Sequence, residues 1–249
     1  MLTQPLLEKL SALRLTGFRQ ALEEQRERPH YAELSFEERL ALLVDREWTR
    51  RENSRLLRRL KAARFHESAI IEDLDLSPSR GLDRRQVLEL AECQWIRHHI
   101  NVIVLGPTGA GKTFLACALG QAACRHDFSV RYVRTSRLLE ELTHAHADGS
   151  YPRVLHSLAR VDLLILDDWL RDPLNPRQTR DLLEVLDDRY GRRSTVLSGQ
   201  VPVDEWHSRF PDPTLADAIL DRLVHNAYRL ELRGESQRKT RSPLAMVNT

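Results

Sequence analysis

The chain has 249 residues, of which 41% are hydrophobic and 30% charged, and its formal net charge is only +2. This length and composition suit one full-sized α/β core with a small extra domain. No apolar run approaches the roughly 20 residues that cross a bilayer, and the first residues lack a basic region followed by an apolar one, so we expect a cytoplasmic protein without membrane contacts. The three cysteines have neither an even count nor metal-ligand spacing, and we expect them to be reduced core thiols.

The first part of the chain has the pattern of amphipathic helices. Residues 3–27 place apolar side chains near a 3.6-residue period, which predicts one helix that ends at the segment RPHY. Ser35 followed by Glu38 predicts a capping box at the start of a second, longer helix. These helices carry too little apolar surface for an independent core. We therefore expect residues 1–65 to form a small all-helical domain that contacts a partner, a neighbouring subunit or nucleic acid, followed by a linker at 66–83.

From residue 84 to the end, helical patterns alternate with short apolar strands. This alternation predicts an α/β fold with a mainly parallel sheet covered by helices on both faces. Because both faces of such a sheet are buried, its strands can be apolar at every position. Helices are expected at 84–97, 112–126, 136–147, 152–159 and 176–190, and strands at 101–105, 130–134, 162–167, 194–198 and near 227–232.

The segment GPTGAGKT is the most specific motif in the chain. It satisfies the P-loop pattern G-x-x-x-x-G-K-[ST] and lies between a predicted strand and a predicted helix. In such a loop the backbone N–H groups converge on phosphate oxygens, Lys112 reaches the β- and γ-phosphates, and the hydroxyl of Thr113 can ligate Mg²⁺. The predicted ATP-binding residues are Gly106, Pro107, Thr108, Gly109, Ala110, Gly111, Lys112, Thr113 and Phe114.

Two acids follow the apolar strand in the segment LLILDDW. A P-loop protein needs a carboxylate at the end of a second strand to reach the Mg²⁺. Because side chains alternate across a strand, adjacent acids point in different directions. We expect Asp167 to ligate the metal with Thr113, and Asp168 to polarise the attacking water. The alternative is that Asp168 only caps the following turn.

Four segments, GPTGAGKT, LLILDDW, SGQVPVDEW and ILDRLVHNAYRLELRGESQRK, occur in this order. Together they resemble the IstB/DnaC-like family of AAA+ ATPases, and within it the IstB branch of helper ATPases in insertion-sequence transposition. The resemblance covers nearly the whole chain. It implies an AAA+ fold at 84–249, Mg²⁺-dependent ATP hydrolysis, assembly into a ring or spiral, binding of duplex DNA, and delivery of that target DNA to a partner transposase.

The resemblance also implies roles for residues that the P-loop motif does not include. Gln200 falls where the family has a polar sensor for the γ-phosphate, and Arg222 matches the arginine presented to the neighbouring subunit's nucleotide. The alternative for Arg222 is a surface cation on a helix. Arg238, accompanied by Lys239, matches the second sensor. One departure is Leu170, where the family often has Gly, and it puts the turn that aims Asp168 in doubt.

Basic residues are concentrated in the second predicted helix. Eight of them stand between positions 46 and 64, against two acids. This charge predicts contacts with the phosphate backbone of duplex DNA, since few exposed aromatic residues are interleaved for base stacking. The alternative location is the AAA+ domain, through loops around 144–153 and 171–180. The predicted DNA-contacting residues are Arg50, Arg51, Arg55, Arg58 and Arg59.

Two other functions compete with the transposition helper. One is a replicative helicase loader of the DnaC type, which would bind a helicase through the N-terminal helices. The other is a P-loop kinase for a small molecule, although the chain has neither an acceptor-binding motif nor an Arg-rich lid. His144, His146 and Asp148 lie close together in sequence, but a polar helix end is a better interpretation than a metal site.

Overall fold

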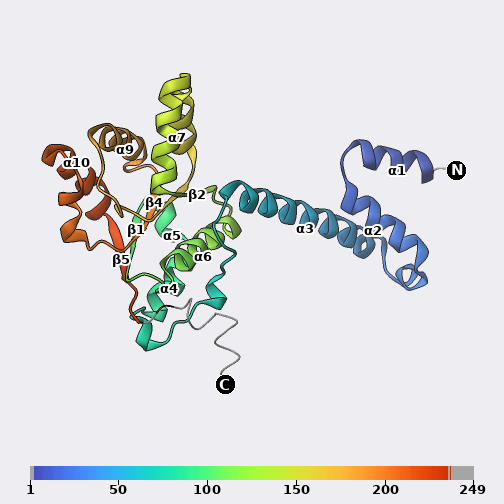
Figure 1. The fold of residues 1–249 in the computed structure, drawn as a ribbon. Coiled ribbons are helices and arrows are strands. Elements are labelled where there is room, and N and C mark those ends of the chain that lie inside the picture. The colour runs from blue at the N-terminus through green and yellow to red at the C-terminus, as the bar shows by residue number, and fades with distance from the viewer. Residues whose placement is uncertain (1–2, 235, 237–249) are drawn as a thin grey trace, which may run out of the picture. The chain divides into compact units, whose positions relative to one another are not determined.

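The computed structural model describes residues 3–234 and Ser236. They form two compact units that divide between Arg58 and Arg59, here called the N-terminal and C-terminal units. Helix α3 (Phe36–Ala63) contains this division (Figure 1). The domain boundaries drawn from the sequence, at 65 and 83, stay predictions.

The N-terminal unit contains two helices where one was predicted. Helices α1 (Thr3–Ala12) and α2 (Thr16–Glu27) are separated by a turn in which Arg14 has a φ of 58°. The prediction of a single helix over 3–27 was therefore wrong. The physical reason is a tertiary contact, because the first N–H groups of α2 are capped by a side chain from α3.

That capping side chain is Glu47, which is only 6% exposed. Its Oε2 accepts hydrogen bonds from the backbone N–H groups of Gly17 at 2.7 Å and Phe18 at 3.2 Å. Arg50 and Arg51 donate to its Oε1 at 2.7 and 2.6 Å. The hydrogen bond from Arg50, assisted by those from Arg51 and the two backbone groups, lowers the pKa of Glu47 to about 2. A buried carboxylate thus joins α2 to α3.

The capping box predicted for α3 is confirmed. The backbone N–H of Ser35 donates to Glu38 Oε2 at 2.8 Å, and the N–H of Glu38 donates to Ser35 Oγ at 3.2 Å. A short 3₁₀ helix, Pro29–Glu33, separates this cap from α2, where the sequence predicted a break. Both features depend on neighbouring residues, which explains why the sequence pattern predicts them.

The C-terminal unit is built on a five-stranded parallel sheet of order β2-β3-β4-β1-β5. Helices α7, α9 and α10 cover one face, and α6 with α4 and α5 covers the other (Figure 1). The predicted α/β class with helices on both faces is confirmed. The elements are α4 (Arg84–Ala91), α5 (Gln94–Arg97), β1 (Asn101–Leu105), α6 (Lys112–Arg125), β2 (Val130–Arg134), α7 (Thr135–Asp148), α8 (Tyr151–Arg160), β3 (Leu163–Asp167), α9 (Pro176–Arg189), β4 (Ser194–Gly199), α10 (Pro213–Val224) and β5 (Ala227–Glu231).

The predicted helix over 84–97 is broken at Cys93, which has a φ of 58° and separates α4 from α5. The break turns the side chains of Trp95 and Ile96 inward, each 3% exposed. The indole N–H of Trp95 donates to the Leu90 carbonyl at 2.8 Å. All three cysteines are free and buried as predicted, and burial raises the pKa of the Cys93 thiol to about 12.

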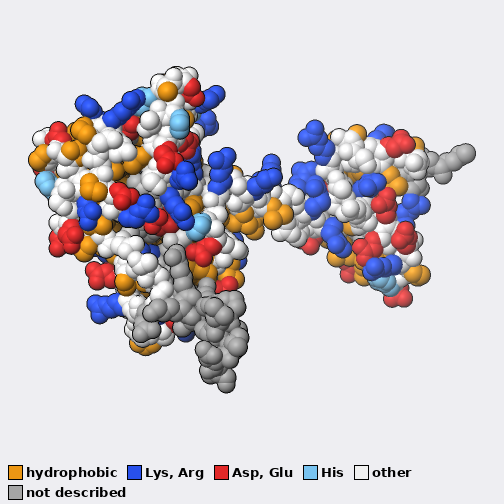
Figure 2. Space-filling view, in the orientation of Figure 1, with side chains coloured by type: hydrophobic (Ala, Val, Ile, Leu, Met, Phe, Trp, Pro, Cys, Tyr) orange, Lys and Arg blue, Asp and Glu red, His pale blue; other side chains and the backbone are white. Residues whose placement is uncertain are grey.

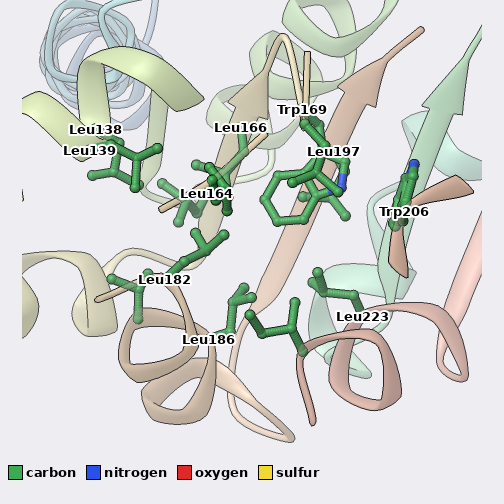
Figure 3. Packing of buried hydrophobic residues seen from close by; sticks show 14 of the residues in the cluster. Leu138, Leu139, Leu164, Leu166, Trp169, Leu182, Leu186, Leu197, Trp206 and Leu223 are labelled. Atoms are coloured by element: carbon green, nitrogen blue, oxygen red, sulfur yellow. The ribbon is translucent and has the colours of Figure 1, made fainter. Parts of the chain in front are cut away.

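The core on the α7, α9 and α10 face consists mainly of leucines, with two tryptophans among its largest side chains (Figure 3). Side chains of the central strands, such as Leu164 and Leu197, pack against Leu182 and Leu186 of α9. Each fully buried side chain of this size contributes about 1.5 to 3 kcal/mol relative to exposure. The core therefore fixes the strands on which the site is built. Within the described residues, every helix is too short or too polar to cross a membrane.

The turn after β3 places two residues in the left-handed region. Asp168 has a φ of 54° and Leu170 a φ of 49°. Aspartate tolerates this conformation, whereas a branched apolar residue adopts it at a cost of about 1 to 2 kcal/mol. The side chain of Leu170 is 1% exposed in the core. The backbone is thus the one that a glycine would take, and the burial of the leucine offsets its strain.

We expect Glu47→Gln to destabilise the N-terminal unit by about 2 kcal/mol, because the charge that holds two arginines and two backbone donors is lost. Hydrogen exchange in α2, measured on the full chain, should accelerate accordingly. Since the pKa of Glu47 in the folded chain, about 2, lies below the ordinary glutamate value of 4.5, protection of α2 in the parent should be lost as the pH falls from about 4.5 toward 2. Glu52→Gln, in an exposed pair with Arg55, is the control. Equal exchange in the two variants would contradict the role of Glu47.

We expect Leu170→Gly to destabilise the protein by about 2 kcal/mol in urea unfolding. Relief of the left-handed strain returns about 1 to 2 kcal/mol, but removal of a buried leucine side chain costs about 2 to 5 kcal/mol. Leu88→Ala, at a position that is 47% exposed, controls for truncation of a leucine. A glycine variant at least as stable as the parent would show that relief of strain balances or exceeds the loss of burial at this turn, and would contradict the prediction.

Candidate nucleotide-binding site

The carboxyl ends of three adjacent strands form the candidate site. Strand β4 lies between β1 and β3 in the sheet. The P-loop follows β1, the acidic pair ends β3, and Gln200 follows β4. Ligands of open parallel sheets bind at this edge. The three motifs separated in sequence therefore meet at one place.

Glycines give the P-loop its backbone path. Gly106, Gly109 and Gly111 have φ values of 151°, 80° and 97°. Helix α6 begins directly afterward, at Lys112. Its first N–H groups have no partner within the helix and, with the helix dipole, favour an anion at this end. The ammonium of Lys112 donates to the Pro107 carbonyl at 2.8 Å, which folds this side chain across the loop.

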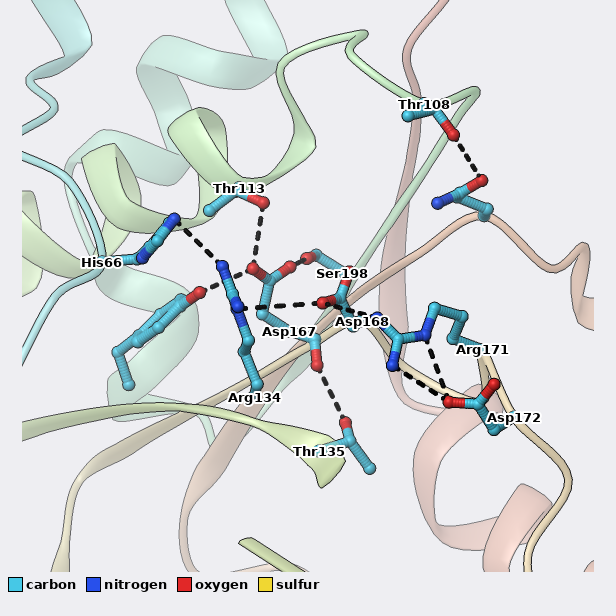
Figure 4. A network of polar contacts seen from close by, with 12 residues as sticks. His66, Thr108, Thr113, Arg134, Thr135, Asp167, Asp168, Arg171, Asp172 and Ser198 are labelled. Carbon is cyan, nitrogen blue, oxygen red and sulfur yellow. Dashed lines mark hydrogen bonds and ion pairs between the residues drawn. The ribbon is translucent and has the colours of Figure 1, made fainter. Parts of the chain in front are cut away.

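The carboxylate of Asp167 is 2% exposed and accepts from hydroxyl groups of three different elements (Figure 4). Its Oδ2 accepts from Thr113 at 2.9 Å and from Tyr132 at 2.6 Å, and its Oδ1 accepts from Ser198. Burial, with the bond to Asp167, raises the pKa of the Tyr132 hydroxyl far above its usual range. The phenol therefore remains a donor at neutral pH.

The donor set fits a magnesium ion. Thr113 and Asp167 present a hydroxyl and a carboxylate oxygen 2.9 Å apart, at the N-terminus of α6. Mg²⁺ prefers oxygen ligands, and it is usually held by one or two protein side chains together with substrate phosphates. These two residues would hold the ion, and it would neutralise charge on the phosphate oxygens when bound.

Asp168 lies in different surroundings from Asp167. Its side chain is 32% exposed, and its Oδ2 lies 3.8 Å from Arg134 Nε and 3.7 Å from Arg171 Nη1. Arg134 also contacts His66, with 3.1 Å between Nη2 and Nε2 (Figure 4). The second acid is thus closer to the solvent than Asp167 and lies between two cations. Its catalytic role stays a prediction.

Gln200 lies beside the P-loop. Its Oε1 accepts a hydrogen bond from Thr108 Oγ1 at 2.7 Å (Figure 4). A side chain in this position can respond to a ligand on the loop. The structure therefore brings the predicted sensor residue to the predicted phosphate site.

Arg222 lies at the opposite edge of the sheet. Its carbonyl accepts from the side chain of Asn101, the first residue of β1, at 3.2 Å. The five-residue strand β1 separates this edge from the P-loop. The length of such a strand along its axis is roughly 13 Å. The guanidinium is paired with Asp187 and lies 5.9 Å from the centre of the Tyr190 ring. Arg222 is therefore turned away from the P-loop of its own chain.

The structure adds residues that the sequence did not single out. Tyr132 and Ser198 complete the surroundings of Asp167, and Arg134 lies beside Asp168. Ser198 and Arg134 end predicted strands at the same edge of the sheet, which is the one signal that could have indicated them. Arg238 and Lys239 lie outside the described residues.

The arginines predicted to contact DNA already make contacts within the chain, most of them on α3 itself. Arg50 and Arg51 share Glu47, and Arg55 pairs with Glu52. Arg58 donates to the Ser54 carbonyl, and Arg59 pairs with Asp127 at 2.6 Å. These pairs reduce the free positive charge of the helix but leave it basic. In the alternative loop region, His146 Nε2 lies 2.8 Å from Asp181 Oδ1.

Comparison with known proteins places this geometry in a family. The model of the IstB-like ATP binding protein family matches residues 8–245. The insertion-sequence ATP-binding protein y4pL of Sinorhizobium fredii is 48% identical over 239 residues, which cover 96% of this chain and 98% of that protein. The ATP-binding protein of insertion sequence IS1162 from Pseudomonas fluorescens is 52% identical over 203 residues, covering 81% and 88%.

Solved structures agree in fold. The crystal structure of DnaI has a TM-score of 0.57 at 21% identity and covers 66% of this chain and 90% of that chain. AMPPCP-bound DnaA from Aquifex aeolicus has a TM-score of 0.57 at 18% identity, covering 71% and 54%. At these identities the likeness establishes the AAA+ fold alone. Together with the family match, it shows that the chain belongs to the IstB-like ATP-binding proteins and has an AAA+ fold.

Proposed function

We propose that the protein is an ATPase that assembles on duplex target DNA and assists a transposase. The observation that carries the proposal is the convergence of Lys112, Thr113, Asp167 and Asp168 at one edge of the sheet. The insertion-sequence names of the relatives support a role in transposition rather than in helicase loading. ATP would bind on the P-loop, with its phosphates at the N-terminus of α6.

The proposed division of labour follows from the surroundings of each residue. The P-loop N–H groups and Lys112 bind and orient the phosphates. The buried carboxylate of Asp167 holds the metal with Thr113, whereas the more exposed Asp168 orients the attacking water. Gln200, bonded to Thr108, is positioned to sense the γ-phosphate.

The location of Arg222 supports hydrolysis that depends on assembly. An arginine at the amino ends of the strands faces away from its own nucleotide and is available to the site of a neighbouring subunit. Its charge would stabilise the γ-phosphoryl oxygens in the transition state, as trans-acting arginines do in other P-loop ATPases. Release from Asp187 would accompany this docking.

Helix α3 is the proposed surface for DNA. Lys and Arg side chains gather over α3 in the space-filling view (Figure 2). Between positions 46 and 64 the eight basic residues outnumber the two acids. An array of such helices in an oligomer would bind the phosphate backbone without reading bases.

ATP hydrolysis and particle size, each measured with and without duplex DNA, test the ATPase. Lys112→Ala should lose ATP binding, and Asp168→Asn should bind ATP and assemble but turn over at least 100-fold more slowly. Arg222→Ala should lose turnover, and mixing it with Lys112→Ala should partly restore it, because each variant supplies what the other lacks. Asp187→Asn removes the same ion pair but leaves the arginine, and it should hydrolyse ATP like the parent. Normal hydrolysis by Arg222→Ala would reject its role.

The salt dependence of DNA binding tests the surface. Affinity for duplex DNA should fall steeply as salt rises. Replacing both Arg55 and Arg58 with Gln should make the negative slope of log K against log salt less steep by about 2 per bound subunit. A matched variant with Arg177 and Arg180 replaced by Gln, which removes the same number of charges, tests the AAA+ loops. If that variant loses the slope and the α3 variant keeps it, DNA binds to the loops instead.

A further inference from the structure

A buried arginine from the segment before α4 lies against the P-loop. Arg80 ends the 3₁₀ helix Pro78–Arg80 and is 7% exposed. Its Nη2 donates to the backbone carbonyl of Ala110, inside the P-loop. A Cβ atom added to Gly111 would lie 3.8 Å from the same nitrogen. A buried guanidinium is costly unless its donors are used, so this contact is a specific one.

The geometry of one peptide bond gives the contact a consequence. The Ala110–Gly111 peptide is trans, since the described residues contain no cis peptide bond. In a planar trans peptide the C=O and N–H bonds point in opposite directions. With the Ala110 carbonyl held toward Arg80, the N–H of Gly111 points to the other side of the loop. Hydrogen bonding of a carbonyl to a cation also polarises the N–H of the same peptide.

Arg80 is itself held in place from several directions. Its backbone N–H donates to the Ser77 carbonyl at 2.9 Å, and its own carbonyl accepts from the N–H of Arg233 at 2.8 Å. Asp75 Oδ2 lies 3.7 Å from its Nε. A Cβ at Gly234 would lie 3.0 Å from its Nη1, so the chain that follows β5 packs closely on the guanidinium. The orientation of the donor is thus set by the surrounding fold.

We propose that Arg80 is a positioning residue for the P-loop, which sets the Ala110–Gly111 peptide so that the Gly111 N–H faces the phosphate chain of a nucleoside di- or triphosphate. This inference rests on the proposed function, since it needs a nucleotide on the loop. Arg80 acts behind the loop and makes no contact with the phosphates in this role. Its effect is on the affinity for the phosphate chain, not on the transfer of the phosphoryl group.

Titration with a fluorescent ATP analogue, on the full chain, tests the inference. Arg80→Gln should weaken binding about tenfold, because a charge-assisted bond to the loop is lost. Arg80→Lys keeps a charged donor and should stay within about threefold of the parent. The matched control is Arg85→Gln, which removes an arginine from an exposed pair with Glu89 on α4. Equal effects of Arg80→Gln and Arg85→Gln would reduce the role of Arg80 to net charge and overturn the inference.

Spectra of protein labelled with ¹⁵N-glycine separate positioning from simple support of the fold. The chain has ten glycines, so the amide signals are few. Arg80→Gln should shift the Gly111 signal of the nucleotide-free protein and leave distant glycines, such as Gly149 and Gly191, unchanged. A variant whose Gly111 signal matches that of the parent would contradict the proposed peptide geometry.

The two proposals fail in different ways. If the parent does not bind the analogue, the proposed function is wrong. If the parent binds it, Lys112→Ala does not and Arg80→Gln binds like the parent, only the inference is wrong. If Arg80→Gln does not fold, binding by the variant Asp75→Asn tests the inference in its place. That variant removes the negative charge near Arg80 but keeps an acceptor for the Ser77 N–H. We expect two- to threefold weaker binding for Asp75→Asn, and parent-like binding would then overturn the inference.

Discussion

The buried carboxylate of Asp167 ties together elements that are far apart in the sequence. Burying a charge costs several kcal/mol unless hydrogen bonds compensate it. Here the donors are hydroxyls of Thr113 in α6, Tyr132 in β2 and Ser198 in β4. Each element therefore has to take one position relative to β3. The start of α6 is fixed in this way, and with it the end of the P-loop.

Residues at the carboxyl end of strand β4 contact both the acidic pair and the P-loop. This strand separates β1 from β3, so a residue at its carboxyl end is within reach of both. Ser198 bonds to Asp167, and Gln200 two residues later bonds to Thr108 in the P-loop. The Ser198 carbonyl also accepts from the N–H of Trp169, at 2.8 Å. A single strand thus sets the relation between the phosphate loop and the acids.

The sequence predicts features that depend on neighbouring residues and misses those that depend on contacts across the fold. The P-loop, the apolar strand that ends at Asp167 and the capping box at Ser35 are all local patterns. The turns at Arg14 and Cys93 are not, because Glu47 caps α2 from another helix and Trp95 turns inward to reach the core. The contact of Arg80 with the P-loop joins residues 30 positions apart, and no periodicity indicates it. The doubt about Leu170 also required the structure, since burial of its side chain decides how the turn is stabilised.

The side chain of Trp169 is an intrinsic fluorophore beside the candidate site. Its indole is 1% exposed, directly follows Asp168, and meets Trp206 edge-on with ring centres 5.7 Å apart. Among the described residues its N–H is one of the few buried donors without a partner. Emission from an indole is sensitive to nearby rings and to hydrogen bonding at its nitrogen. Movements of the turn that carries the second acid are therefore coupled to an intrinsic fluorophore, and the chain needs no attached dye to report them.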